Sequence, residues 1–370
     1  MTDKKALVAM SGGVDSSVAA YLLKRDGYSL IGAMMKLYSA DDPDQYRGCC
    51  GIEDSNDARA VAAELGMPFY VFNFADVFKK EVMDRFVLSY ESGETPNPCI
   101  DCNRFLKFGR LIRRAWDLDT KYVATGHYAR IDKDKSGRYF LKKGVDPSKD
   151  QSYVLFAMTQ EELAHTIFPL GELTKEETRV MAAKQGFINA KKRDSQDICF
   201  VPDKNYAGFI KKYSGKEYEP GNFISMDGKT LGIHKGLIHY TVGQRKGLGI
   251  SSQKPLFVSR INPNDNTITL VESEELFSKH LKARQINLIP FARLDGKLKC
   301  SAKIRYAHTP ADAFIRQTGE DSLHVEFKMP QRAITPGQAV VFYDGDIVIG
   351  GGIIDGNKSS NATGGKIPLC

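Results

Sequence analysis

Short apolar runs alternate with amphipathic stretches along the first half of the chain. Runs of consecutive apolar residues predict buried strands, and apolar residues spaced three and four apart predict helices. The last predicted helix opens with Thr174 and Glu177, which have capping-box spacing. Strands are predicted at residues 6–10, 29–38, 68–74 and 121–131, and helices at 16–27, 54–66, 77–90, 104–116 and 174–186. This alternation is typical of a doubly wound α/β domain, in which helices cover a parallel sheet.

The pattern changes near residue 206. The following stretch is rich in glycine, lysine and tyrosine and shows no long helical period, which favours a small, mostly β module. Beyond it, short alternating or apolar segments between turn residues indicate a barrel or a sandwich, and we expect the barrel. The predicted domains are an α/β domain at 1–205, a central β-rich domain at 206–275 and a C-terminal β-barrel at 276–358, with a flexible tail at 359–370.

Length and charge agree with several domains and a polyanionic partner. A chain of 370 residues exceeds what one hydrophobic core usually serves. Lysine and arginine exceed aspartate and glutamate by 52 − 45 = 7, which favours RNA or another polyanion, although a basic but inert surface is the alternative. The short basic runs "AKKRD", "IKKY" and "GQRKG" could face phosphates, but each alone is more often a solvated face.

The apolar runs and the cysteines indicate a cytoplasmic location. No run approaches the ~18 apolar residues of a membrane span, so we expect no membrane partner. The seven cysteines are odd in number and follow no secretion signal, so we expect reduced thiols and no disulfide framework. We expect Cys49 and Cys50 to be structural, Cys300 to lie in the core and Cys370 to be inert.

The segment "MSGGVDSS", residues 10–17, joins the first predicted strand to the first helix, which is where open α/β sheets bind ligands. Its glycines, hydroxyls and helix N-terminal amides suit a phosphate, although a serine-rich helix cap is the alternative. Asp15 suits a bare phosphate poorly and fits better as a Mg²⁺ ligand or an orienting group. The segment is neither a Walker loop nor Gly-x-Gly-x-x-Gly. It resembles the PP-loop of ATP pyrophosphatases, which implies that ATP binds here.

Cys99 and Cys102, in "NPCIDCN", could hold a metal, cycle as a redox pair or handle sulfur. A structural zinc needs about four ligands, and the sequence offers neither a second such pair nor closely spaced histidines, so we predict no metal site. A thioredoxin-like pair would need no ATP loop. The sulfur-handling alternative brings in Cys199, in "DSQDICF", 199 − 102 = 97 residues further on.

The motifs "MSGGVDSS", "NPCIDCN", "ATGHYAR", "KDQSYVL", "DSQDICF" and "GQRKGLGI", in this order, resemble the tRNA-specific 2-thiouridylase family. The resemblance implies that ATP adenylates the C2 oxygen of the wobble uridine in tRNA, and that sulfur from a cysteine persulfide then replaces this oxygen. It also implies that Cys102 is the nucleophile, that Cys199 carries the persulfide and that a transient disulfide joins them. A persulfide donor is then a second partner beside tRNA, and Mg²⁺ accompanies ATP.

The resemblance assigns further residues one by one. Residues implied to contact ATP are Ala9, Met10, Ser11, Gly12, Gly13, Val14, Asp15, Ser16, Met35 and Gly126. Residues implied to contact tRNA or its target base are Asn97, Pro98, Cys99, His127, Lys149, Asp150, Gln151, Arg305, Tyr306 and Gln338. A common form of the pattern has aspartate where Cys99 stands. We favour Cys102 as the nucleophile because it directly precedes the amphipathic stretch "NRFLKFGRLIRRAW", residues 103–116, whose helix dipole should lower the pKa of the thiol.

Two other functions compete with this interpretation. Another PP-loop ligase, such as an amidating synthetase, needs no paired thiols, so its activity would survive alkylation. A non-catalytic RNA-binding module with a zinc clip would contain stoichiometric zinc and would not turn over ATP.

Overall fold

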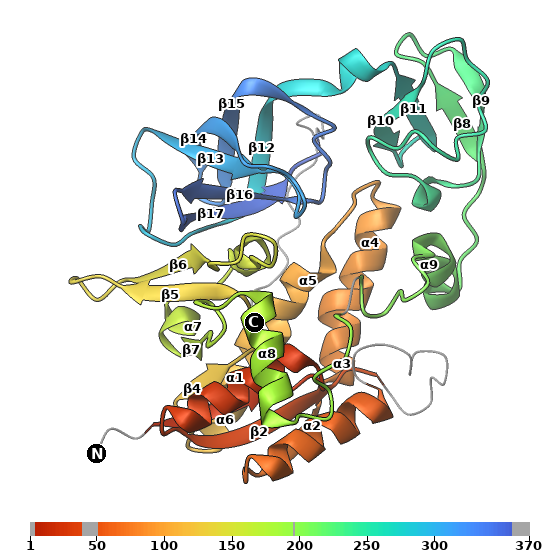
Figure 1. The fold of residues 1–370 in the computed structure, drawn as a ribbon. Helices are drawn as coiled ribbons and strands as arrows, with labels where there is room; N and C mark the ends of the chain where they lie inside the picture. The colour runs from red at the N-terminus through yellow and green to blue at the C-terminus, as the bar shows by residue number, and fades with distance from the viewer. Residues whose placement is uncertain (1–3, 39–50, 195–196, 357–370) are drawn as a thin grey trace.

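The computed structural model describes residues 4–38, 51–194 and 197–356. The predictions for Cys49, Cys50, Cys370 and the tail lie outside these residues. In the part described, the chain forms a layered α/β unit, a small four-stranded sheet and a β-barrel (Figure 1). Figure 1 shows the α/β unit at the base, with the small sheet and the barrel side by side above it.

The predicted parallel sheet is confirmed. Its strand order is β3-β2-β1-β4-β7, and every neighbouring pair is parallel. The strands are β1 (Lys5–Ala9), β2 (Ser29–Lys36), β3 (Phe69–Asn73), β4 (Tyr122–Ala124) and β7 (Thr166–Ile167). Strand β1 lies in the middle, and its residues Ala6, Leu7 and Val8 have no exposed surface. Burial on both faces explains why this strand appears in the sequence as a continuous apolar run.

Helices flank this sheet, and two of the predicted helices extend further than expected. The helices of this unit are α1 (Val14–Arg25), α2 (Ile52–Glu64), α3 (Ala75–Phe78), η2 (Lys79–Asp84), α4 (Arg85–Glu91), α5 (Pro98–Asp101), η3 (Cys102–Arg110), α6 (Leu111–Asp117), η4 (Ser152–Leu155), α7 (Gln160–Ala164) and α8 (Lys175–Gln185). Segments α3, η2 and α4 follow one another without a break, as do α5, η3 and α6. Both η2 and η3 have π-helical hydrogen bonding. Helix α8 has the predicted capping box and ends at Gly186 in a left-handed conformation.

The single strand predicted at 121–131 is wrong. Strand β4 ends at Ala124, the chain turns, and β5 (Ala129–Lys133) begins a hairpin with β6 (Tyr139–Lys143). Strand β6 pairs with β17 of the barrel, so this hairpin belongs to the barrel's sheet. Apolar residues flank the turn on both sides, from β4 and from Ala129 and Ile131 of β5, and periodicity alone does not show that the two strands belong to different sheets.

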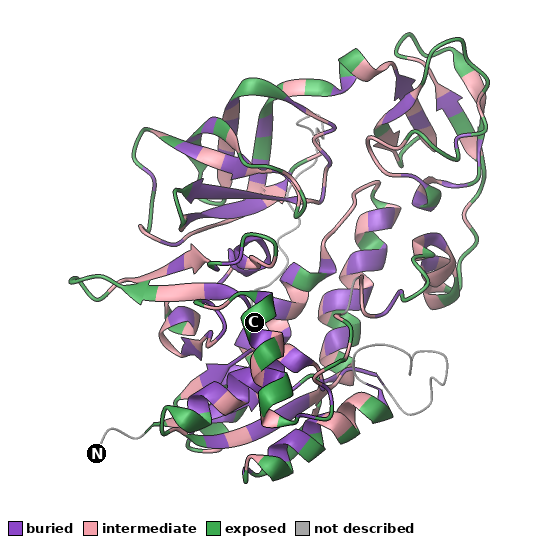
Figure 2. Ribbon diagram, in the orientation of Figure 1, coloured by how far each residue is buried: buried purple, intermediate pink, exposed green. Residues whose placement is uncertain are grey.

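The barrel is confirmed. Six strands follow the order β12-β15-β14-β13-β16-β17, and a β12–β17 pairing closes the ring. They are β12 (Phe277–Leu288), β13 (Lys297–Lys303), β14 (Ala311–Gly319), β15 (Ser322–Arg332), β16 (Ala339–Asp344) and β17 (Ile347–Ile354). Figure 2 shows buried and exposed positions alternating along several of these strands. Cys300 lies buried in this core, as predicted, and burial raises the pKa of its thiol to about 12.

The central stretch combines a sheet with one unpredicted helix. Its strands are β8 (Gly221–Ile224), β9 (Thr230–His234), β10 (Phe257–Asn262) and β11 (Thr267–Val271), in the order β10-β11-β8-β9. Before them comes helix α9 (Tyr206–Ser214), where we expected no helical segment. Its residues Ala207 and Ile210 are buried in the same cluster as the α/β unit's helices, and Phe209 packs on Phe86 of α4. The division into domains at residues 205 and 275 stays a prediction.

Candidate active site

The loop between β1 and α1 is held by its own hydroxyl groups. Gly13 is the N-cap of α1, and the hydroxyls of Ser16 and Ser17 both donate to its carbonyl oxygen, at 3.0 and 3.1 Å. The Ser16 hydroxyl also accepts from the backbone N–H of Ser11 at 3.2 Å. These bonds fix the loop and orient the first turn of α1, where helix amides suit an anion.

Two glycines let other segments approach this loop closely. Gly12 has a φ of +72°, and a Cβ placed there would overlap the backbone of Asp54 at the start of α2. A Cβ on Gly126 would lie 2.8 Å from the backbone nitrogen of Ser16. The turn after β4 therefore covers the first turn of α1. Glycine at these two positions thus lets α2 and the turn after β4 pack directly against the loop backbone.

Asn189 supports the loop from behind, and no sequence signal marked it. Its Nδ2 donates to the carbonyl oxygen of Gly12 at 3.0 Å and to the hydroxyl of Ser17 at 2.9 Å. Its Oδ1 is buried and has no hydrogen-bond partner. Because buried polar atoms are nearly always paired, this oxygen has room for one hydrogen-bond donor, which a phosphate does not supply; the role of Asn189 is to hold the loop through its two donated bonds.

Asp15 lies in the first turn of α1 and is already paired. Lys175 donates to its Oδ1 at 2.6 Å, and the hydroxyl of Tyr128 donates to the same oxygen at 2.9 Å. Burial raises the pKa of Tyr128, and the charge of Asp15 raises it further. This pairing fits the predicted orienting role of Asp15.

Asp194 joins the same ionic network. It accepts ion pairs from Lys149 and Lys175, each at 2.8 Å, and from Arg179 at 2.9 Å. Burial alone would raise its pKa, but the bonds from Lys149 and Lys175 lower the pKa to about 2. Asp194 is the first residue of the motif "DSQDICF", and Lys175 lies within the predicted capping box. Both residues thus belong to segments that the sequence singled out, but their ion pair was not predicted.

Met35 lies on β2 and lines a pocket together with Met34, Tyr38, Ile52 and Val71. This apolar lining suits the predicted place of Met35 beside an adenine. The hydroxyl of Tyr38, another lining residue, donates to Sγ of Cys199 at 3.6 Å. The structure therefore brings the predicted sulfur carrier to the wall of the predicted adenine pocket, a link that sequence did not show.

Cys99 and Cys102 lie in one helix, and our expectation about its start was wrong. The side chain of Asn97 accepts from the backbone N–H of Cys99 at 3.1 Å, and the helix begins at Pro98. Cys102 is the fifth helical residue, whereas Cys99 lies in the first turn, where the dipole acts most strongly. The dipole argument thus favours Cys99, and the assignment of Cys102 as nucleophile rests on the family resemblance. The sequence did contain a signal for this start, since asparagine at the N-cap followed by proline at the first helical position is a common helix opening, but the prediction followed the apolar period alone.

The two cysteines differ in exposure. Cys99 is exposed, while Cys102 is half-buried and packs against the main core cluster of the α/β unit. Cys199 is also half-buried and packs against that cluster. A half-buried thiol suits sulfur chemistry because nearby side chains can exclude water and stray oxidants from it.

Residues predicted to touch tRNA tie the barrel to the α/β unit. Gln338 donates to the carbonyl oxygen of Thr95 at 2.7 Å, and the hydroxyl of Tyr306 donates to the carbonyl oxygen of Asp150 at 3.3 Å. Burial raises the pKa of Tyr306, and the charges of Asp150 and Cys99 add to this. Tyr306 is 43% exposed and lies near Cys99, in agreement with a place beside the target base.

The other predicted tRNA contacts also have partners within the protein. The Asp150 carboxylate accepts from the backbone N–H groups of Gly144 and Ser152, at 3.2 and 3.0 Å. The Gln151 side chain accepts from the N–H of Tyr128 at 3.0 Å. These bonds position the segment "KDQ" next to the turn that covers the nucleotide loop. Contact with tRNA at these positions, and at Arg305, stays a prediction.

His127 lies inside the protein, 7% exposed. Its Nε2 accepts from Lys107 at 3.2 Å, and its Nδ1 lies 2.6 Å from the hydroxyl of Thr125. Burial lowers the pKa of His127 well below its usual value, and Lys107 lowers it further. The neutral ring therefore helps to hold the turn beside Gly126, and contact of His127 with tRNA stays a prediction.

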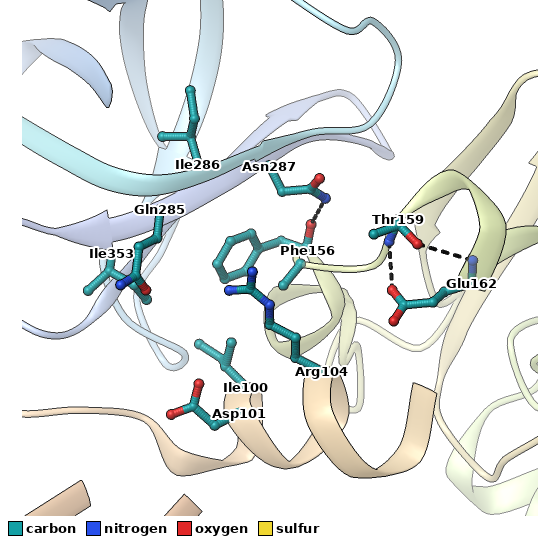
Figure 3. A pocket seen from close by; sticks show the side chains of 11 residues that line it. Ile100, Asp101, Arg104, Phe156, Thr159, Glu162, Gln285, Ile286, Asn287 and Ile353 are labelled. Carbon is teal, nitrogen blue, oxygen red and sulfur yellow. Dashed lines mark hydrogen bonds between the residues drawn. The ribbon is translucent and has the colours of Figure 1, made fainter. Parts of the chain in front are cut away.

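A second pocket lies between the cysteine helix and the barrel (Figure 3). From the helix, it is lined by Ile100, Asp101 and Arg104. At about 100° per residue these side chains project away from Cys99 and Cys102. We assign this pocket no part in the thiol chemistry. Within the described ranges, no group of three or more His, Cys, Asp or Glu side chains is arranged to hold a metal ion, and no helix is long and apolar enough to cross a membrane.

Three family profiles match the chain in succession. They are described as the tRNA methyl transferase HUP domain, at residues 4–203, the tRNA methyl transferase PRC-barrel domain, at 207–272, and the aminomethyltransferase beta-barrel domain, at 278–354.

Similar proteins span nearly the whole chain. The tRNA-specific 2-thiouridylase MnmA of Clostridioides difficile (strain 630) is 52% identical over 355 residues, 95% of this chain and 98% of that protein. The protein of the same name from Lachnoclostridium phytofermentans is 50% identical over 354 residues, 95% of this chain and 99% of its own. A solved structure of a 4-thiouridine synthetase–RNA complex with bound ATP is 19% identical in sequence, with a TM-score of 0.34. The match covers 55% of this chain and 46% of the synthetase chain.

Proposed function

This chain belongs to the tRNA-specific 2-thiouridylase family, and we propose that it uses ATP to replace the C2 oxygen of the wobble uridine of tRNA with sulfur. The observation that carries the proposal is 52% identity over 95% of the chain to a protein of that name. Methyl transfer, the activity named in two profile descriptions, has no need of two distant thiols.

The first step activates the uridine. Uridine C2 is a poor electrophile and its oxygen a poor leaving group, so attachment of AMP with release of pyrophosphate converts that oxygen into a good leaving group. The N–H groups of Ser11 and Gly13 are bonded to hydroxyls within the loop. The first-turn amides of α1, at Val14, Asp15 and Ser16, would hold the phosphates. Asp15 orients this turn through Lys175 and Tyr128. Mg²⁺, bound with ATP, would neutralise phosphate charge.

The second step transfers sulfur. The terminal sulfur of a persulfide on Cys199 attacks C2, a carbon–sulfur bond forms and AMP leaves. The Cys102 thiolate then attacks Sγ of Cys199, so that the sulfur–sulfur bond breaks and the transferred sulfur stays on uridine. The products are 2-thiouridine and a Cys102–Cys199 disulfide, which an external dithiol reduces. A persulfide donor such as a cysteine desulfurase or a relay protein reloads Cys199.

The first test measures nucleotide chemistry. With tRNA and Mg²⁺, the protein should form AMP and pyrophosphate from ATP. Asp15→Ala or Ser16→Ala should abolish both products while tRNA binding persists, because binding rests on other surfaces. Unchanged AMP formation in these variants would overturn the assignment of the loop. An amidating ligase on the same fold would keep its turnover after Cys102 and Cys199 are alkylated, whereas this protein should lose it.

A further inference from the structure

Lys303, the last residue of β13, places its ammonium group against two tyrosine rings. Its Nζ lies 5.7 Å from the ring centroid of Tyr153 and 5.7 Å from that of Tyr306. The two rings meet edge to face, with their centroids 5.9 Å apart. Tyr153 is fully buried, whereas Tyr306 is 43% exposed and Lys303 is half-buried. The ammonium therefore lies beside the ring through which this aromatic pair reaches the surface.

The charge of Lys303 has no direct counterpart among the residues that the structure describes. Within them, its ammonium forms no ion pair and no hydrogen bond. The Asp150 carboxylate acts on it from further away and already accepts from the N–H groups of Gly144 and Ser152 and from the Ser152 hydroxyl. Burial lowers the pKa of Lys303, and the charge of Lys143 lowers it further. Because a partly buried charge is costly without a partner, an anion would be favoured here.

A second cation of the same segment is also available to an anion. Arg305 lies two residues after Lys303, and across the described ranges its guanidinium forms no ion pair and no hydrogen bond. Lys143 differs from both, because its ammonium donates to the carbonyl oxygen of Gly345 at 2.9 Å. The end of β13 and the turn after it thus present two cations whose N–H groups are unused.

These cations lie next to the proposed place of the target base. Tyr306 lies near Cys99, and its hydroxyl donates to the carbonyl oxygen of Asp150 at 3.3 Å. An exposed aromatic ring is a platform on which an unstacked RNA base can stack. A base on Tyr306 would bring the phosphates of its own nucleotide within reach of Lys303, whose side chain ends beside that ring.

A backbone phosphate suits Lys303 better than the edge of a base. The lysine ammonium is a compact point charge with three rotatable donors, so it can meet phosphate oxygens from many directions. It lacks the planar pair of donors with which arginine reads a base edge. Phosphate contacts also fix the position and orientation of a nucleic acid, which is what a reaction at one atom of one base requires.

We propose that Lys303 is a further substrate-binding residue, whose ammonium binds a backbone phosphate next to the target uridine and so holds this base at Tyr306, beside Cys99. The inference rests on the proposed function, since it requires that tRNA presents its wobble uridine at Tyr306.

The experiment uses two synthetic tRNAs and an otherwise identical unmodified tRNA. Each synthetic tRNA has one uncharged methylphosphonate, in place of either the phosphate that precedes the wobble uridine or the one that follows it. Filter binding at one fixed salt concentration measures the affinity. With the unaltered protein, at least one replacement should lower the affinity about tenfold, as expected for loss of a hydrogen bond between charged groups. Lys303→Gln should bind the unmodified tRNA about tenfold more weakly, and the same replacement should then cost little more.

Two other substitutions of Lys303 separate its charge from its packing. Lys303→Met is uncharged but keeps an unbranched apolar side chain against the two rings, so it should behave like Lys303→Gln. Lys303→Arg keeps the charge and should retain the full cost of the replacement. A purely structural role of Lys303 would weaken binding of all three tRNAs by the same factor, and the replacement would still cost about tenfold in the uncharged variants.

Lys299→Gln is the matched control. Lys299 lies on the same strand and on the same face of it, four residues and therefore about 13 Å from Lys303. The variant loses the same charge, yet it should bind the unmodified tRNA normally and keep the full cost of the replacement.

The proposal is overturned if neither replacement weakens binding to the unaltered protein, or if both keep their full cost in Lys303→Gln and Lys303→Met. Thiolation of the unmodified tRNA is measured in parallel. If the unaltered protein thiolates no tRNA, the proposed function fails. If it thiolates tRNA and the costs of the replacements do not depend on Lys303, only the role of Lys303 fails.

Discussion

Gln338 donates a hydrogen bond from Nε2 to the carbonyl oxygen of Thr95, 2.7 Å away and 243 residues earlier in the chain. The N–H of Thr95 donates to Pro336 at 2.8 Å, and its hydroxyl donates to that of Thr241 at 3.3 Å. The α/β unit, the central stretch and the barrel therefore meet at Thr95, two residues before Asn97 caps the cysteine helix. The barrel positions that helix through Gln338 and Pro336.

Gln338→Ala should lower the free energy of unfolding by about 1 to 2 kcal/mol, because it leaves a half-buried carbonyl without its donor. Denaturant titration measures this. Gln331→Ala is the control, since the Gln331 amide donates locally to Met329 within β15. The Gln331→Ala variant should thiolate tRNA at the normal rate, whereas the Gln338→Ala variant should thiolate tRNA more slowly. Weaker tRNA binding in Gln338→Ala with unchanged stability would mean that Gln338 acts as an RNA contact instead.

Gly12→Ala should both destabilise the protein and abolish ATP binding. A left-handed φ costs a non-glycine residue about 1 to 2 kcal/mol, and here the Cβ would also displace the backbone of Asp54. Gly27→Ala shares the positive φ, at +83°, but its Cβ would meet no atom within 4 Å. It should show the conformational cost alone and bind ATP normally. Equal effects of the two variants on ATP binding would refute the requirement for close packing of Asp54 against Gly12.

The buried His127 should make the protein less stable in mild acid. Burial and Lys107 hold its folded-state pKa well below 6.5, so below about pH 6.5 the unfolded chain binds a proton that the folded protein does not. The free energy of unfolding should therefore fall as the pH drops from 7.5 to 5.5. The fall should be smaller in His127→Gln, which has no ring to protonate. An equal fall in both proteins would contradict a buried neutral His127.

Salt should weaken tRNA binding strongly. If about four to seven phosphates are neutralised, the slope of log affinity against log salt should be about −3 to −6. Arg305→Gln should make the slope shallower by about 0.7 to 0.9. Lys254→Gln, in an exposed pair with Glu272 of the central stretch, serves as the control and should leave the slope unchanged. A slope near zero would mean that the positive charge plays no part in binding.

The sequence predicted the sheets and helices of this fold better than the segments that connect them. Continuous apolar runs located β1 and β2, and short alternating segments located the barrel, because burial of one or both faces determines each pattern. The hairpin β5–β6 was assigned to the wrong sheet, since its apolar residues look the same in either sheet. Helix α9 was missed although Tyr206, Phe209, Ile210 and Tyr213 have helical spacing, because the glycines, lysines and tyrosines around it favoured a β-rich interpretation.

The candidate site was predicted through its motifs, and its ionic network was not. The loop at Ser11–Gly13 follows from the position of glycines and hydroxyls between a strand and a helix. Lys175 and Asp194 lie 160 and 179 residues after Asp15, and nothing local to either indicates that Lys175 pairs with both carboxylates. The start of the cysteine helix was misplaced because the prediction relied on the apolar period and did not use the pair Asn97 and Pro98 as a start signal.

The most direct test of the central claim is mass analysis of tRNA nucleosides after incubation with the protein, ATP, Mg²⁺, a cysteine desulfurase and cysteine. The unaltered protein and Cys300→Ser should each convert the wobble uridine to a nucleoside in which one sulfur replaces one oxygen. Cys102→Ser and Cys199→Ser should give none, and Cys99→Ser should retain most of the product. No thionucleoside from the unaltered protein, or thiolation kept in Cys102→Ser and lost in Cys99→Ser, would contradict the account.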